Sequence, residues 1–228
     1  MKTAGMLGGT DWQLTALYCQ GMNEMVRQRL GDRHSAKMLI HTPDAVELAS
    51  LQEKGHWREI GRLLEEASGQ LVAAGAGFLM ICSNSLHIVA EQLSAAVSVP
   101  FLHIGEAIGQ RLHQDGIRRA GMLGTAFAPE QAFLRQSLAD SFDIDLLLPD
   151  TGASLAIHNL ISRGETDLTP EVADKLSVIF NAFRDHGAKA ILLGGRRIGR
   201  LVRQSTCPLP MYDTVSLHIE AAVRLALA

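Results

Sequence analysis

Several features that mark specialised classes of protein are missing from this sequence. Basic residues are not in excess, since 21 Lys and Arg stand against 24 Asp and Glu, and the formal net charge is −3. This balance disfavours general binding to nucleic acids, because such binding needs surplus positive charge to neutralise phosphates. The longest apolar and glycine run, residues 71–82, is far shorter than the roughly 20 residues that a membrane-spanning helix needs. We therefore expect neither a nucleic-acid partner nor a membrane segment.

Signatures of metal and nucleotide binding are missing as well. The three cysteines, Cys19, Cys82 and Cys207, form no CxxC pair, and the nine histidines form no HxxxH or HxH pattern. Neither a GxGxxG sequence after the first strand pattern nor a Walker sequence occurs. An odd number of unpatterned cysteines is typical of free thiols in a reducing compartment, and residues 1–9 reach glycines too early for a signal peptide. We expect a cytoplasmic protein with no metal.

What the sequence does contain is an internal repeat. Residues 4–8 (AGMLG) return letter for letter as residues 120–124, an offset of 116. Residues 75–81 match residues 187–193 at an offset of 112, and the Val-Pro-Phe-Leu sequence at 99–102 matches the Leu-Pro-Met-Tyr sequence at 209–212 at an offset of 110. Three matches in the same order at nearly the same offset indicate two related halves.

Each half alternates short apolar runs with long amphipathic stretches, which is the pattern of a parallel sheet covered by helices. The expected strands are 3–7, 37–42, 77–82, 100–103, 119–123, 143–148, 189–193 and 210–212. The expected helices are 12–30, 56–74, 85–96, 104–115, 129–141, 151–163, 170–186 and 214–227. We predict an α/β protein whose first domain is 1–104 plus 209–228 and whose second domain is 105–208, the two related by a pseudo-twofold with the ligand cleft between them.

Local signals refine the helix ends. Gly75 and Gly187 each follow a helical pattern and precede a strand, where a left-handed residue is needed and glycine adopts it freely. Thr169 followed by Pro170 is typical of a helix start, with the threonine as the cap. Asp11 is expected to cap the helix that follows it rather than to act in catalysis.

The expected ligand site lies at the carboxyl ends of the strands, because backbone N–H groups of turns and helix starts point into a crevice there. Four segments follow strands at these places, two from each half: residues 8–11, 83–85, 124–126 and 194–197.

Several motifs in order carry a resemblance to a known family. They are residues 5–9 with Trp12, residues 34–37, Gln52 with Gly55 and Trp57, Asn84 with His87, residues 100–104, residues 123–125 with Glu130 and Gln131, Ile198 with Gly199, and Asp213 and Thr214 with His218. Over essentially its whole length the chain resembles the cofactor-independent aspartate/glutamate racemases, in the superfamily that also includes hydantoin racemase, maleate isomerase and arylmalonate decarboxylase. The resemblance implies two Rossmann-like halves, a homodimer, and neither metal nor pyridoxal phosphate.

The family's chemistry uses two cysteines, one on each side of the substrate's α-carbon. One thiolate removes the α-proton and the opposite thiol returns a proton to the other face. By the resemblance, the first cysteine position falls on Ser83, because residues 83–85 (SNS) occupy the Cys-Asn-Thr place. The second falls on Gly195, which occupies the cysteine of the Gly-Cys-Thr-Glu place. Both thiols are therefore expected to be absent.

Two neighbouring side chains could compensate for the missing thiol at Ser83. Cys82 is one residue away, but alternation along a strand would point it into the sheet packing, so a buried core residue is favoured over a catalytic thiol. His87 lies four residues after Ser83, on the same face if a helix begins there. It could activate the hydroxyl, although a hydrogen bond at the helix start is the favoured interpretation.

The ligand-holding part of the family site is expected to be retained. By the resemblance, it falls on small hydroxyls and amides at Thr10, Gln52, Asn84, Ser85, Thr125 and Thr214. Arg196 and Arg197 replace the residues after the second cysteine. They either bind a carboxylate or phosphate in a bidentate manner, or belong to a solvated or subunit-contact face.

The sequence thus favours an aspartate/glutamate racemase-like protein that acts on or binds a small amino acid or carboxylate without a cofactor. Its racemisation is expected to be atypical or weak, because the two thiols are missing. Two alternatives remain open: a carboxylate-binding or regulatory relative that does not racemise, and a different reaction of the superfamily, such as a decarboxylation.

Overall fold

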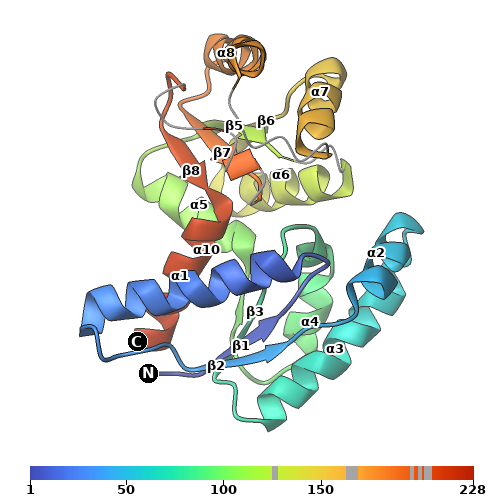
Figure 1. The fold of residues 1–228 in the computed structure, drawn as a ribbon, viewed down its shortest axis with the longest axis vertical. Helices are drawn as coiled ribbons and strands as arrows, with labels where there is room; N and C mark the ends of the chain where they lie inside the picture. The colour runs from blue at the N-terminus through green and yellow to red at the C-terminus, as the bar shows by residue number, and fades with distance from the viewer. Residues whose placement is uncertain (125–127, 163–168, 196–197, 200–201, 203–206) are drawn as a thin grey trace. The chain divides into compact units, whose positions relative to one another are not determined.

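The computed structural model describes residues 1–124, 128–162, 169–195, 198–199, 202 and 207–228. The chain divides into two compact units (Figure 1). The first unit comprises Met1–Ile104 and His218–Ala228, and the second comprises Gly105–Leu217. Each contains a parallel sheet and helices, so the predicted α/β class with two related halves is confirmed.

The first unit contains a sheet with strand order β2-β1-β3-β4 in its described residues. Its strands are β1 (Ala4–Leu7), β2 (Met38–His41), β3 (Phe78–Ile81) and β4 (Phe101–Leu102). Its helices are α1 (Trp12–Leu30), α2 (Ala45–Glu53), α3 (Trp57–Ala73), the short 3-10 helix η1 (Ser85–Val89), α4 (Ala90–Ala96) and, from His218 on, α10 (Thr214–Leu227).

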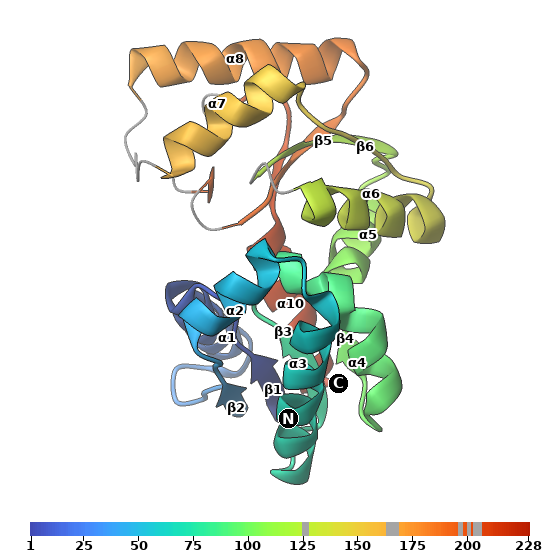
Figure 2. The same cartoon turned by 90° about the vertical axis from the view of Figure 1, so that its right-hand side faces the viewer.

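The second unit contains a sheet with the equivalent order β6-β5-β7-β8 in the part of the chain that is described. Its strands are β5 (Arg119–Leu123), β6 (Asp145–Leu147), β7 (Ala190–Leu193) and β8 (Met211–Asp213). Its helices are α5 (Ile104–Gln114, from Gly105 on), α6 (Ala128–Phe142), α7 (Thr151–Ser162) and α8 (Pro170–Asp185). Figure 2 shows α7 and α8 on one face of this sheet and α5 and α6 on the other.

The internal repeat corresponds to equivalent strands in register. Ala4 of β1 pairs with Phe78 of β3, and Ala120 of β5 pairs with Ala190 of β7. Alternate side chains of the central strands then pack against equivalent helices. Leu7, Leu79 and Ile81 pack with Ile60, Leu64 and Leu71 of α3, while Leu123, Ile191 and Leu193 pack with Leu176, Phe180 and Phe183 of α8. Burial of alternating apolar side chains therefore builds both halves.

At the glycine inside each repeated AGMLG segment, a core side chain packs directly against the strand backbone. A Cβ added at Gly5 would lie 2.4 Å from Cδ2 of Leu79, and one at Gly121 would lie 2.5 Å from the ring of Phe183. Both distances are far inside van der Waals contact, so only glycine lets these core side chains lie against the strand.

The local helix signals are confirmed. Gly75 and Gly187 have φ of 97° and 87°, and each donates its N–H to a carbonyl of the helix that it ends. The hydroxyl of Thr169 accepts from the N–H of Val172 at the start of α8. The carboxylate of Asp11 accepts from Gln13 and Leu14 at the start of α1.

The structure differs from the sequence expectations in three places. The single helix expected over 85–96 is divided into the 3-10 helix η1 and the α-helix α4. Helix α2 was not predicted, although Asp44 caps it through hydrogen bonds from Val46 and Glu47 and supplies the usual start signal. The stretch after residue 208 does not return to the first unit as a whole. Strand β8 pairs in parallel with β7 of the second sheet, and the chain joins the first unit only at His218.

No helix in the described part of the chain combines the length and apolarity needed to cross a membrane.

Candidate functional site

The carboxyl ends of β1 and β3 bring together the two predicted segments of the first unit, residues 8–11 and 83–85. The backbone hydrogen bonds between these two strands continue beyond the end of β3, since the N–H of Cys82 donates to the carbonyl of Leu7 at 2.8 Å. The turn after β1 then passes directly beside Ser83. A Cβ added at Gly9 would lie 2.8 Å from Cβ of Ser83, so glycine is required for this approach. Ser83 is buried at this junction, with 8% of its surface exposed.

A chain of hydrogen bonds connects three of the predicted site residues. Gln52, at the end of α2, donates its amide N–H to Oγ of Ser85 at 2.9 Å. Oγ of Ser85 lies 3.3 Å from Oγ of Ser83. Within the described residues Ser85 is the only hydrogen-bonding partner of the Ser83 hydroxyl. The structure thus joins Gln52, Ser83 and Ser85 into one polar cluster.

Thr10 and Asn84 flank this cluster and are half-buried. Thr10 lies in the turn after β1, between Gly9 and the capping residue Asp11. Asn84 precedes η1, and its backbone carbonyl accepts the N–H of His87 at 3.2 Å. Their role in ligand binding stays a prediction.

His87 is completely buried and contacts the backbone of Ser83 rather than its hydroxyl. Its Nδ1 lies 2.7 Å from the carbonyl oxygen of Ser83, so Nδ1 carries the proton and donates it. Burial, followed by nearby His218 and His103, lowers the pKa of His87 well below its usual value. The ring is therefore neutral, and its Nε2 is a buried lone pair with no hydrogen-bond partner among the described residues.

Two further histidines surround His87. The ring centroid of His103 lies 5.2 Å from that of His87, and the centroid of His218 lies 5.3 Å from it. His218 donates from Nε2 to the carbonyl of Leu102 at 3.2 Å and accepts at Nδ1 from the hydroxyl of Tyr18 at 2.9 Å. Burial lowers the pKa of both His103 and His218 to about 4. We call His87, His103, His218 and Tyr18 the histidine cluster.

The sequence analysis did not identify this cluster as a structural unit. His87 was considered only as a neighbour of Ser83, His103 and His218 were noted only as carriers of the family resemblance, and Tyr18 carried no signal of its own. Tyr18 and His218 are 200 residues apart, so no local pattern joins them.

Cys82 lies in the core beside the cluster. Its surface is completely buried. Burial, reinforced by the nearby Cys19 of α1, raises the pKa of the Cys82 thiol well above its usual value. A thiol in this environment stays protonated at neutral pH and is a poor base. Cys207 is also buried and packs in the core of the second unit.

Two predicted residues lie at the carboxyl end of β7 in the second unit. Gly195 has φ of 103°, and among the described residues a Cβ built there would meet no heavy atom within 4 Å. It offers no side chain for acid or base chemistry. Thr214, at the start of α10, is completely buried, and its hydroxyl donates to the carbonyl of Leu193 at 3.0 Å. Thr125, Arg196 and Arg197 lie outside the described residues.

The described residues contain no group of three or more His, Cys, Asp or Glu side chains placed to hold a metal ion. The chemistry available in the first unit consists of hydroxyls, amides and neutral imidazoles at the ends of parallel strands. Such groups bind and orient a small polar ligand without net charge.

Comparison with solved structures places this arrangement among known folds. A candidate Asp/Glu racemase from Yersinia pestis is 32% identical and superposes with a TM-score of 0.93, with both chains fully covered. An aspartate racemase homologue from Pyrococcus horikoshii is 21% identical with a TM-score of 0.88, again over both full chains. The aspartate racemase of Picrophilus torridus is 15% identical with a TM-score of 0.76, over 99% of this chain and 94% of that one.

The family model that describes Asp/Glu/hydantoin racemases matches residues 7–222, which is nearly the whole chain. The protein therefore belongs to the Asp/Glu/hydantoin racemase family.

Proposed function

We propose that this protein binds a small amino acid or carboxylate without a cofactor, and that it is weak or inactive as a two-base racemase. The observation that best supports this proposal is the environment of Ser83, which by the family resemblance occupies the place of the first cysteine. Its hydroxyl contacts Ser85 and, among the described residues, no group that could take up its proton. A serine hydroxyl ionises far above neutral pH and needs such a base.

The neighbouring groups support the same conclusion. His87 uses its Nδ1 proton on the Ser83 carbonyl, so it orients the backbone at Ser83 rather than deprotonating the hydroxyl. Cys82 is fully buried and its thiol pKa is raised, so it does not supply the missing thiolate. Gly195 has no side chain to serve as the second base. What remains is the Gln52–Ser85–Ser83 cluster, which is suited to holding a carboxylate or amino group.

The test measures binding and turnover separately. Binding is followed as the rise in unfolding temperature with L- and D-aspartate, L- and D-glutamate and a panel of small dicarboxylates, since a ligand at about 100 times its Kd stabilises the folded state by about 2.7 kcal/mol. Turnover is followed by proton NMR as loss of the α-proton signal of both enantiomers in deuterium oxide.

We expect stabilisation by at least one of these ligands, reduced in Gln52→Ala and Ser85→Ala. We also expect α-proton exchange no faster than in Ser83→Ala and Cys82→Ala. Rapid exchange that Ser83→Ala abolishes would contradict the weak-racemase part of the proposal. Absence of both stabilisation and exchange with every ligand would contradict the binding part.

We also propose that the protein forms a homodimer and is located in the cytoplasm. These two proposals rest on the family resemblance and on the three free cysteines. Light scattering on the purified protein tests the first: a mass of twice 24.7 kDa is expected, and a monomer mass would contradict it.

A further inference from the structure

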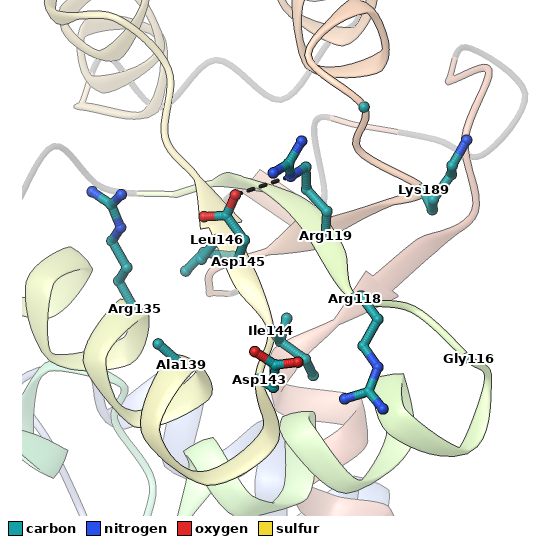
Figure 3. Close-up of a pocket in the computed structure, with 11 residues that line it drawn as sticks. Gly116, Arg118, Arg119, Arg135, Ala139, Asp143, Ile144, Asp145, Leu146 and Lys189 are labelled. Carbon is teal, nitrogen blue, oxygen red and sulfur yellow. Dashed lines mark ion pairs between the residues drawn. The ribbon is translucent and has the colours of Figure 1, made fainter.

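A pocket of about 690 Å³ lies in the second unit, at the amino ends of its strands (Figure 3). It is bordered by the first residues of β5 and β6, Arg119 and Asp145, and by Lys189 directly before β7. Because the strands are parallel, this end of the sheet is opposite to the end that carries Gly195. The pocket is therefore distinct from the candidate site described above.

Four basic side chains line the pocket: Arg118, Arg119, Arg135 and Lys189. Only two acidic side chains, Asp143 and Asp145, accompany them in the lining. The formal charge of the lining is thus positive, although the whole chain carries a net charge of −3. A local excess of cations in a concave surface attracts anions.

The partners of these cations show which of them are available. Arg119 forms an ion pair with Asp145 at 2.9 Å (Figure 3), and it also donates to the carbonyl of His186. Arg118 donates to the carbonyl of Phe142 at 2.8 Å, which positions its guanidinium without neutralising the charge. The side chains of Arg135 and Lys189 have neither a hydrogen bond nor an ion pair with any described residue.

The pocket also has an apolar floor and a suitable size. Ile144 and Leu146 are buried beneath it, and Ala139 of α6 lines its side. Its volume falls within the range of about 300–1,000 Å³ that is typical of small-molecule sites. A single inorganic ion would leave most of this space empty, whereas an organic anion would fill it.

The equivalent end of the first sheet repeats these charges only in part: by the offset of 116 Lys2 takes the place of Arg118, whereas Arg119 and Lys189 have no basic counterpart. The N–H of Gly77 donates to the carbonyl of Thr3 at 2.8 Å, just as the N–H of Lys189 donates to the carbonyl of Arg119 at 2.9 Å. The residues that correspond to Arg119 and Lys189 are thus Thr3 and Gly77. The basic pocket is a property of the second unit and does not follow from the shared fold.

We propose that this pocket binds a small organic polyanion with two or more phosphate or carboxylate groups. Arg135 and Lys189 contact the anionic groups, and Arg118, held by Phe142, adds to the positive field. The planar guanidinium of an arginine suits bidentate contact with either group. The carboxylate of Asp143 repels the anion, so removal of its charge provides a second, independent test of affinity.

The experiment measures binding of pyrophosphate and of citrate to the purified protein by calorimetry at low ionic strength. We expect the protein to bind at least one probe. If only pyrophosphate binds, the natural ligand carries phosphate groups, and if only citrate binds, it carries carboxylate groups. If both bind, the pocket recognises negative charge without distinguishing the two groups. The absence of binding by both probes overturns the proposal.

Variants assign the binding to this pocket. Arg135→Gln with Lys189→Gln should weaken binding about tenfold or more, because hydrogen bonds to charged groups are lost. Asp143→Asn should strengthen it about two- to fivefold, the range of an exposed charge contact. The matched control is Arg29→Gln with Arg33→Gln, which removes two exposed cations of the first unit and should leave affinity unchanged. An equal loss in the control would overturn the proposal, since it would show a non-specific charge effect.

The outcome is independent of the proposed function. Arg135→Gln with Lys189→Gln should leave any stabilisation by aspartate or glutamate at the Ser83 cluster unchanged, because both residues lie in the other unit.

Discussion

The two units share a sheet and differ in where they place their polar chemistry. Both have the same strand order and register, and both cover one face of the sheet with an amphipathic helix. The first unit gathers three neutral histidines, two of them fully buried, and a hydroxyl cluster near the carboxyl ends of its strands. The second gathers exposed cations at the amino ends. Packing constrains the alternating apolar side chains within each strand, but it does not constrain the residues at the strand ends. Those residues were therefore able to diverge between the two halves.

The strongest test of this comparison restores thiols at the equivalent ends of β3 and β7. Ser83→Cys combined with Gly195→Cys should raise α-proton exchange with aspartate or glutamate by about 10²- to 10⁴-fold, the usual contribution of positioned acid–base groups. Proton NMR in deuterium oxide measures it. A side chain at 195 meets none of the described residues, and its left-handed backbone costs about 1–2 kcal/mol.

The control for that experiment is Ser83→Ala with Gly195→Ala, which has the same backbone cost and no thiol. If the double cysteine variant exchanges no faster than this control while remaining folded, the mapping of the family positions onto residues 83 and 195 is wrong.

A second test compares two histidines that make the same hydrogen bond in different environments. His87 donates to the Ser83 carbonyl at 2.7 Å in the core, and His186 lies 2.7 Å from the Ala182 carbonyl at the exposed end of α8. His87→Ala should lower the free energy of unfolding by about 2–4 kcal/mol, through a cavity and an unpaired carbonyl. His186→Ala should change it by less than about 0.5 kcal/mol. Urea unfolding measures the free energy of both variants. A similar loss of unfolding free energy in the two would contradict the prediction that burial makes His87 more important for stability.

The third test concerns pH. Histidine in an unfolded chain has a pKa of about 6.5, whereas His103 and His218 have a pKa of about 4 in the folded protein. Between these values the unfolded chain binds more protons, so stability is fully present above pH 6.5 and falls as the pH drops toward 4. Each such histidine contributes about 1.4 kcal/mol per pH unit to the slope.

Urea unfolding at several pH values between 7.5 and 4.5 measures this slope. His103→Gln should flatten it, because the lowered pKa of His103 then no longer contributes. An unfolding free energy that is the same at pH 7 and pH 5 would be incompatible with a neutral buried cluster.

The smallest expected effect compares the glycines that end α3 and α8. Gly75→Ala and Gly187→Ala should each destabilise the protein by about 1 kcal/mol, because alanine is strained at positive φ. The loss should be slightly larger at Gly187, where an added Cβ would lie 3.2 Å from the guanidinium of Arg119. Thermal unfolding measures both, and a larger loss at Gly75 would contradict this reading of the contact.

Much of the fold could be predicted from the sequence because its signals are local. The apolar runs of residues 3–7 and 119–123 show a strand, and Gly75, Gly187 and Thr169 mark helix ends by their own backbone preferences. Helix α2 was missed even though Asp44 and Glu47 supply a start signal. The chain's return to the first unit was placed at residue 209, although the match of residues 209–212 to residues 99–102 makes β8 the counterpart of β4 and so indicates the second sheet.

The candidate site could be predicted only in part. Ser83, Ser85 and Gln52 were singled out, and the structure joins them by hydrogen bonds that cross 33 residues of sequence. The interpretation of Cys82 as a core residue followed from strand alternation, and its burial agrees with that. The orientation of His87 could not be decided, because the Ser83 hydroxyl and carbonyl lie at the same sequence distance from it.

The sequence by itself determined the α/β class, the duplication and the family, because each depends on spacing and order along the chain. Only the tertiary structure decided that three histidines are neutral and that four cations border one pocket. Protonation and local charge depend on neighbours in space. Tyr18 contacts His218, and Arg135 and Lys189 come to line one pocket, only when the chain folds.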